Sequence, residues 1–442
     1  MYENLFYFRT ISENLCKYTR FWQKLYNFAF LCIMVLINSQ FLKVADDEIQ
    51  RQIDKRTNWF QTVYRDKKII RLDSGDVVRP LAPCVVKAMT GAIAEMGDEA
   101  TFKGRGPLGG YPFLTDAIVK FNFKNYRVKI EPDEVFINHG TKEDLVGMGD
   151  ILCRDNRIAV IDPVSQDYIE SNVIGNRAGD LTENRQWSHI LYLECKKEND
   201  FMPEFPKLRS DVIYLSYPNN PTGCVMTRET LEKWVKYAIE NDILILFDAT
   251  YKSFITDADI PRTIYEIKDA KKVAIEFRSF SKNAAFTGLH CGYTIIPKKL
   301  SGYSFRANKS ASLNALWRKR LMIKNYTPPY IIQKGAEAIY SEEGLKWVAE
   351  NVSYYMSNAA IMRRALSEAR LKYWGGVNSP YIWVESPYGS SWKLFDKLLN
   401  DCCILSSPGE RFGPLGKGFV RLSSFANQSK VIMAGTRISD IK

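Results

Sequence analysis

The feature that most constrains the fold is a series of short, almost wholly apolar segments along the first three quarters of the chain. Three of them cover residues 157–161, 212–216 and 243–247, and a helix is predicted between the last two, over residues 228–240. Strands that are apolar on both faces are typical of parallel sheets covered by helices on each side. We therefore predict an α/β fold with a mainly parallel central sheet flanked by helices.

The pattern changes at about residue 330. Long helices are predicted over residues 331–340 and 344–371, and a short strand, a helix and a final strand follow them. This arrangement indicates a smaller α+β lobe. We predict four parts: an N-terminal extension, an arm that joins the small domain, a large domain built on the parallel sheet and a small C-terminal domain (residues 1–36, 37–83, 84–325 and 326–442).

Composition excludes several classes of function. The chain has 442 residues and a net charge of +11, but its basic residues are dispersed, which disfavours nucleic-acid binding. Its nine cysteines show no CxxC spacing and it has three histidines, so no metal site is expected. The apolar run over residues 28–37 is too short to span a bilayer comfortably. We expect a cytoplasmic protein whose extension makes no membrane contact.

Polar residues follow successive predicted strands where those strands end. Asn220 follows the strand over residues 212–216, Asp248 and Tyr251 follow the next, and Lys282 follows the apolar run 273–277. Each residue alone could cap a helix, pack or lie in solvent. Ligands of parallel sheets bind at the carboxyl ends of the strands, so their convergence favours a common site. A desolvated lysine there suits a Schiff base with an aldehyde cofactor.

Pyridoxal 5'-phosphate requires the groups that these positions supply. Lys282 would hold the aldehyde and later move the α-proton, and Asp248 would face the ring nitrogen. Asn220 and Tyr251 would donate to the ring hydroxyl, and Arg421 would pair with a substrate carboxylate. A glycine turn that opens a helix and two further hydroxyls form the predicted phosphate site (Thr141, Lys142, Ser279 and Ser281).

Six motifs carry a resemblance to known enzymes. Asn-Asn-Pro-Thr-Gly (219–223), Phe-Asp-Ala-Thr-Tyr (247–251) and Ser-Phe-Ser-Lys (279–282) resemble class I/II aminotransferases of fold type I. The segments over residues 74–81, 276–282 and 373–383 resemble the LL-diaminopimelate aminotransferase family more closely.

The resemblance implies an activity and a partner. Family members transfer an amino group between LL-2,6-diaminopimelate and 2-oxoglutarate, a step of lysine biosynthesis, with pyridoxal phosphate. They are homodimers with sites at the subunit interface. The resemblance also implies substrate contacts at Gly75, Lys142, Asn220, Arg421 and Tyr326.

Five positions depart from the family pattern. Ser165 stands where the family has a ring-stacking tyrosine, and His290 where it has a phosphate-binding arginine. Arg105 and Leu108 replace a tyrosine that reaches the partner's cofactor and a glutamate that reads the distal ammonium, and Tyr326 replaces an interface asparagine. We still expect Ser165, His290 and Arg105 to lie beside the cofactor.

These departures leave two alternatives to the main interpretation. Leu108 favours an aminotransferase of the same fold with another amino donor, such as lysine or an aromatic amino acid. The changes at Ser165, His290, Leu108 and Tyr326 together favour a catalytically impaired paralogue that acts as a binding or dimerisation module.

Overall fold

The computed structural model describes residues 37–44, 47–324 and 326–441, and it divides into two units, residues 1–43 and 44–442. In the first unit, the described residues contain a 3-10 helix, Ser39–Lys43. The predicted extension over residues 1–36 lies outside the described residues. All the other described helices and strands belong to the second unit.

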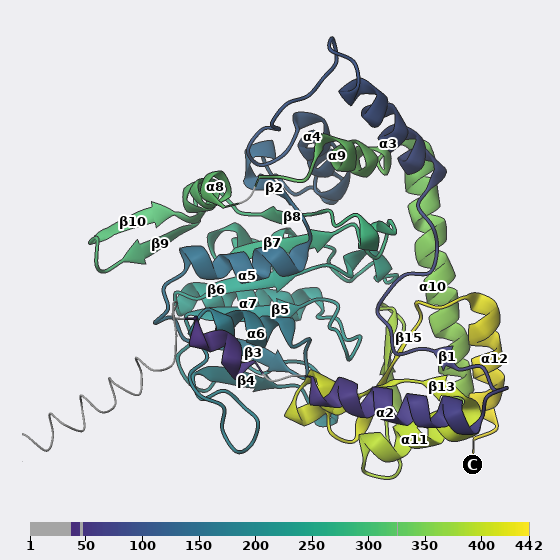
Figure 1. The fold of residues 1–442 in the computed structure, drawn as a ribbon. Coiled ribbons are helices and arrows are strands. Elements are labelled where there is room, and N and C mark those ends of the chain that lie inside the picture. Colours follow the sequence, from purple (N-terminus) through teal and green to yellow (C-terminus); the bar gives the residue numbers. More distant parts are fainter. Residues whose placement is uncertain (1–36, 45–46, 325, 442) are drawn as a thin grey trace, which may run out of the picture. The chain divides into compact units, whose positions relative to one another are not determined.

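A seven-stranded sheet forms the centre of this unit (Figure 1), and its strand order is β2-β8-β7-β6-β5-β3-β4. Strand β8 pairs antiparallel with β2 and β7, and the other pairings are parallel. The expected mainly parallel sheet is therefore confirmed. The strands are β2 (Val135–Asn138), β3 (Ile158–Asp162), β4 (Ile190–Glu194), β5 (Val212–Ser216), β6 (Leu244–Asp248), β7 (Ala274–Ser279) and β8 (Gly292–Ile295).

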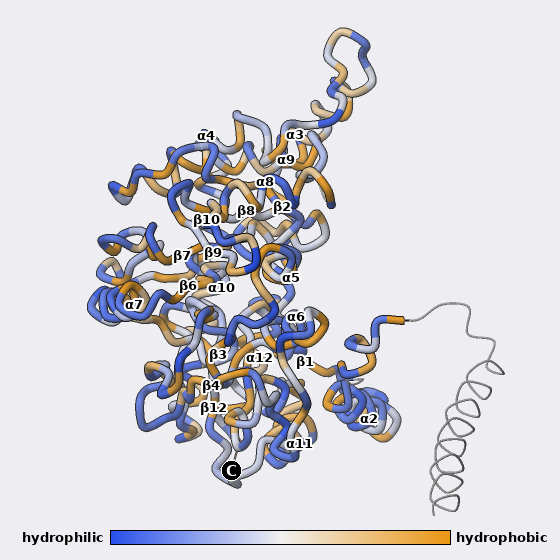
Figure 2. Tube along the Cα trace, turned by 90° about the vertical axis from the view of Figure 1, so that its left-hand side faces the viewer, coloured by the Kyte–Doolittle hydropathy of each residue, from blue (hydrophilic) through white to orange (hydrophobic). Residues whose placement is uncertain are grey.

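Helices cover both faces of the sheet. Figure 2 places α7 on one side of the strands and α5 and α6 on the other. Thr227 caps α7 by accepting a hydrogen bond from the Thr230 N–H, and the helix buries Leu231, Trp234 and Ala238 at helical spacing. The helices around the sheet are α3 (Pro83–Met96), α4 (Pro112–Asn122), α5 (Thr141–Ile151), α6 (Asp167–Ile174), α7 (Arg228–Glu240), α8 (Leu313–Ile323) and α9 (Tyr330–Ala338).

The C-terminal elements form a four-stranded antiparallel sheet of order β11-β12-β15-β14. The long helix α10 runs beside it and contacts α12 (Figure 1). These elements are α10 (Glu342–Glu368), β11 (Tyr373–Gly375), β12 (Tyr381–Glu385), α11 (Ser391–Cys402), β14 (Ser407–Pro408), β15 (Phe419–Ser423) and α12 (Gln428–Ser439).

The segment before residue 83 packs on these C-terminal elements. Strand β1 (Ile70–Arg71) pairs with β13 (Ile404–Leu405), and α2 (Glu48–Val63) contacts α11. Helix α2 is mainly hydrophilic (Figure 2), but its Ile53 and Phe60 are buried. Both side chains belong to the hydrophobic cluster of the C-terminal helices and strands, so burial of apolar surface holds this segment in place.

Several element boundaries differ from the sequence prediction, and two of them involve residues of the predicted phosphate site. Helix α5 begins at Thr141 rather than near Glu143, because Gly140 (φ 117°) ends the extended chain and Thr141 already has helical geometry. Strand β7 continues to Ser279 rather than ending at Phe277, because pairing with β8 satisfies the backbone of its last two residues. A hairpin that was not predicted, β9 (Ser301–Ser304) and β10 (Lys309–Ser312), extends beyond the sheet (Figure 1).

We predict that Gly110→Ala lowers the free energy of unfolding by about 1–3 kcal/mol. Gly110 has φ 119°, and a Cβ atom there would lie 2.2 Å from Ile137 Cγ1. Urea unfolding followed by circular dichroism measures the change. The control is Gly104→Ala, because a Cβ atom at Gly104 meets nothing within 4 Å. Equal stability of the two variants would contradict the prediction.

Candidate active site

Lys282 lies three residues beyond the end of β7 and is only partly exposed. Its pKa is lowered, chiefly by burial. Asp76 opposes this effect and Arg421 adds to it, so both charges lie near the amine. The structure therefore holds the Lys282 side chain among charged groups of the C-terminal sheet and the N-terminal segment rather than in bulk water.

Asp248 is the last residue of β6, and its side chain is buried. Its Oδ2 accepts a 2.6 Å hydrogen bond from the Tyr168 hydroxyl, and its Oδ1 accepts one from the Thr250 N–H at 2.9 Å. Burial raises the pKa of this carboxyl, and the two donors oppose the shift. A cation placed beside the carboxylate would offset its burial, which is the chemistry that a protonated pyridine nitrogen provides.

Tyr168 was not predicted from the sequence. It lies in the first turn of α6, at the same edge of the sheet, three residues after Ser165. This spacing after β3 is the one available signal. Tyrosine is common in hydrophobic cores. Its position in the sequence therefore could not show whether Tyr168 donates a hydrogen bond to Asp248 or only packs in the core.

Arg421 joins β15 to the loop after β5. Its Nη1 donates to Asn220 Oδ1 at 2.8 Å, and its Nη2 donates to the Asp73 carbonyl at 2.5 Å. The guanidinium stacks 4.5 Å from the centre of the Tyr381 ring and 4.8 Å from that of Phe412. Its Nε is buried without a partner in the described structure. The group is fixed in position and retains a donor for an anion.

Tyr381 links this arginine to the predicted cofactor residues. Its hydroxyl lies 2.8 Å from the Tyr251 hydroxyl. A Cβ atom at Gly75 would lie 2.7 Å from the hydroxyl oxygen of Tyr381, so only glycine allows the backbone to approach this tyrosine so closely. Tyr381 was not predicted as a site residue, although it lies inside a motif that carries the resemblance.

The predicted phosphate residues form three separate local contacts. Thr141 Oγ1 lies 3.0 Å from Thr250 Oγ1, and Ser279 Oγ accepts from the Ser281 N–H at 3.1 Å. Lys142 instead pairs with Asp167, 2.5 Å between Nζ and Oδ1.

Ser165 donates to the other oxygen of that carboxylate, Asp167 Oδ2, at 3.2 Å. The serine at the position of the ring-stacking tyrosine therefore belongs to a local network with Asp167 and Lys142.

The remaining predicted residues have other contacts. Arg105 donates to the Tyr326 hydroxyl at 2.9 Å and stacks on the same ring at 4.4 Å. His290 is exposed with φ 53°. Among the described residues, no hydrogen bond joins these three side chains to Lys282, Asp248 or Asn220. Leu108 packs against the main hydrophobic core.

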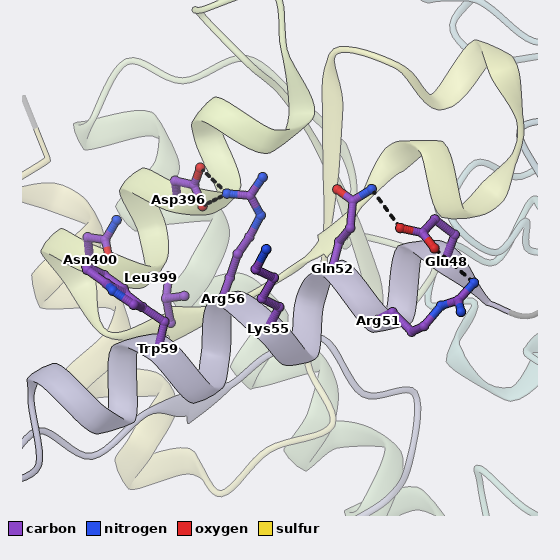
Figure 3. A pocket seen from close by; sticks show the side chains of 9 residues that line it. All are labelled: Glu48, Arg51, Gln52, Lys55, Arg56, Trp59, Asp396, Leu399 and Asn400. Carbon is purple, nitrogen blue, oxygen red and sulfur yellow. Dashed lines mark hydrogen bonds and ion pairs between the residues drawn. The ribbon is translucent and has the colours of Figure 1, made fainter.

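A groove of about 730 Å³ lies between α2 and α11 (Figure 3). Arg56 crosses it to Asp396, with 2.9 Å between Nη1 and Oδ2. None of the predicted cofactor or substrate residues lines this groove. It is therefore separate from the cluster at the strand ends.

Known proteins resemble the chain over almost its whole length. A sequence model of the family "Aminotransferase class I and II" matches residues 67–433. The LL-diaminopimelate aminotransferase of Parabacteroides distasonis is 48% identical over 406 residues, which are 92% of this chain and 99% of that protein. The same-named protein of Bacteroides thetaiotaomicron is 46% identical over 409 residues, 92% of this chain and all of that protein.

Solved structures of aminotransferases also resemble the chain over most of its length. The LL-diaminopimelate aminotransferase of Chlamydomonas reinhardtii superposes with a TM-score of 0.84 at 33% identity, covering 92% of this chain and 98% of that one. A Thermus thermophilus aspartate aminotransferase variant shares the fold, with a TM-score of 0.77 at 17% identity over 92% of this chain and all of that one. Among the described helices, none is long and apolar enough to cross a bilayer.

The resemblance that the motifs at residues 219–223, 247–251 and 279–282 predicted is thereby confirmed. With a match over most of its length, the chain belongs to the aminotransferase class I and II family.

Proposed function

We propose that this protein is a pyridoxal-phosphate-dependent aminotransferase that exchanges an amino group between LL-2,6-diaminopimelate and 2-oxoglutarate. The observation that carries the proposal is the enclosed Lys282 amine, with its lowered pKa, near the fixed guanidinium of Arg421. The relatives of that name at 46–48% identity over 92% of the chain supply the substrate class.

The donor set fits pyridoxal phosphate. Lys282 supplies the amine that would hold the aldehyde, and Asp248, positioned by Tyr168 and Thr250, supplies a buried carboxylate for the ring nitrogen. Tyr251 would donate to the ring hydroxyl. When bound, the cofactor supplies an electron sink for the charge that develops at the substrate α-carbon.

Lys282 would move the α-proton. A lysine accepts a proton near neutral pH only if its pKa is lowered, and burial lowers that of Lys282. Asp76 opposes the shift and Arg421 adds to it, so the base strength of the amine depends on the balance between burial and these two charges.

Arg421 would bind the α-carboxylate of the substrate. Tyr381 and Phe412 hold the guanidinium plane, and Asn220 and the Asp73 carbonyl fix its rotation. Because these contacts already order the side chain, little conformational entropy is lost when the carboxylate binds. We also propose that the protein works as a homodimer, as the family resemblance implies, with the Arg105 loop near the partner.

A second candidate is an aminotransferase for another donor, such as lysine or an aromatic amino acid. Leu108 favours it, because a leucine packed against the core cannot bind the distal ammonium of LL-diaminopimelate. Both candidate functions use the same residues around Lys282. They differ only in which group the protein binds at the distal end of the amino donor.

Purified protein mixed with pyridoxal phosphate should absorb visible light, and borohydride should bleach that absorption. The Lys282→Ala variant should lack the band, and the control Lys236→Ala, an exposed residue of α7, should keep it. A wild-type protein that remains colourless at saturating pyridoxal phosphate would favour the binding-module alternative and contradict the proposal.

LL-diaminopimelate should be the best amino donor to 2-oxoglutarate. Glutamate release is measured with LL-diaminopimelate, lysine and phenylalanine at equal concentrations, and kcat/KM should be highest for the first. A higher kcat/KM for lysine or phenylalanine would support the second candidate instead.

Asp76→Asn should lower the pKa of Lys282 further, because Asp76 is the group that raises it. The amine is then unprotonated at lower pH, so its rate of modification by trinitrobenzenesulfonate should rise at a lower pH in cofactor-free protein. Peptide mass spectrometry follows Lys282 alone, and Asp116→Asn is the control. A profile that is unchanged or moves to higher pH would refute this role of Asp76.

A further inference from the structure

A cavity of about 330 Å³ lies beside the candidate active site but does not include its central residues. Its wall comes from α4 and the turn after it, the segment after β6, the end of β7 with the loop after it, β8, and the residues after α9 together with the first turns of α10. Lys282, Asp248, Asn220 and Arg421 do not line it. Thr250 and Ser279 do, so the cavity and the candidate site share two wall residues.

The charged groups that line the cavity are all basic. Lys252 and Arg278 contribute an amine and a guanidinium, and no aspartate or glutamate lines the wall. Three tyrosines, three asparagines, two serines and one threonine complete the polar part (Tyr126, Tyr293, Tyr340, Asn122, Asn125, Asn283, Ser253, Ser279 and Thr250). Such a lining presents donors and positive charge to whatever occupies the space.

Arg278 has a donor without a partner. Its side chain is 2% exposed, its Nε pairs with Glu276 at 2.5 Å, and its Nη2 donates to the Arg262 carbonyl at 3.1 Å. Its Nη1 is buried without a hydrogen-bond partner in the described part of the chain. An unsatisfied buried donor of this kind is costly, and it belongs to a residue that lines the cavity.

Lys252 is the second unusual group. Its Nζ donates to Asn122 Oδ1 at 2.8 Å. Burial and the nearby Arg278 hold its pKa well below the usual range, while Glu276 opposes them; Arg262 and Glu266 are the other charges that act on it. An anion in the cavity would reverse this shift, because it favours the protonated amine.

The rest of the wall is apolar and comes from aromatic and branched side chains (Phe121, Phe280, Ile339, Leu345 and Val348). A ligand that suits both the basic wall and the apolar wall of the cavity has one negative charge and a compact apolar body. We propose that this cavity is a second ligand site, which binds a small organic carboxylate through Lys252 and Arg278. The proposal does not depend on the amino donor or on pyridoxal phosphate.

Isothermal titration calorimetry of the holoenzyme with benzoate tests the proposal, and benzamide is the matched uncharged probe. Benzoate should bind, benzamide should bind at least about tenfold more weakly, and Lys252→Met should weaken benzoate by about tenfold or more. Lys236→Met, on the exposed face of α7, is the control and should bind as wild type does.

A second variant keeps the charges of Lys252 and Arg278 and reduces the volume of the cavity. Leu345→Trp would narrow the cavity from its apolar side and should also weaken benzoate binding, whether or not Lys252→Met folds. The absence of benzoate binding, equal binding of benzamide, or full affinity in Leu345→Trp would overturn the proposal. Full affinity in Lys252→Met would place benzoate at another anion site, such as Arg421, and would overturn it as well.

Discussion

The contact between Arg421 and Asn220 is the interaction on which the site depends. It joins the last strand of the C-terminal sheet to the loop after β5, so it brings the Arg421 guanidinium to the carboxyl ends of the central strands. Tyr381 extends the link to Tyr251. Because the arginine is buried, its charge also acts on Lys282 and contributes to the lowered pKa of that amine. One side chain thus connects the two parts of the site and, after burial and Asp76, contributes to the pKa of Lys282.

Burial has the opposite effect on the two groups that would hold the cofactor. It lowers the pKa of Lys282 and raises that of Asp248, so both are shifted toward their neutral forms. A cofactor with an aldehyde and a protonatable nitrogen would offset the cost of burying both groups. The aldehyde would react with the Lys282 amine, and the protonated nitrogen would place a cation beside the Asp248 carboxylate. In the described structure, Asp248 relies on the hydroxyl of Tyr168 and one backbone N–H instead.

The residues at the ends of the central strands could be predicted from the sequence, but the side chains that surround them could not. Apolar strands followed by Asn220, Asp248 and Lys282 predicted the sheet edge, because position along a parallel strand determines which residues share that edge. Tyr168 and Tyr381 were missed because their partners lie 80 and 130 residues away, and no local pattern records such pairings. The cavity at Lys252 was missed for the same reason, since its wall comes from five separate segments. The Asp167 pairing of Lys142 likewise depends on where α6 packs against α5.

The central claim is that one amine, that of Lys282, carries the cofactor. Borohydride reduction of the protein with pyridoxal phosphate, followed by peptide mass mapping, tests it most directly. The account predicts that the reduced phosphopyridoxyl group is found on the peptide that contains Lys282, in a stoichiometry near one per chain. A label on Lys252 or on surface lysines, with Lys282 unmodified, would contradict it.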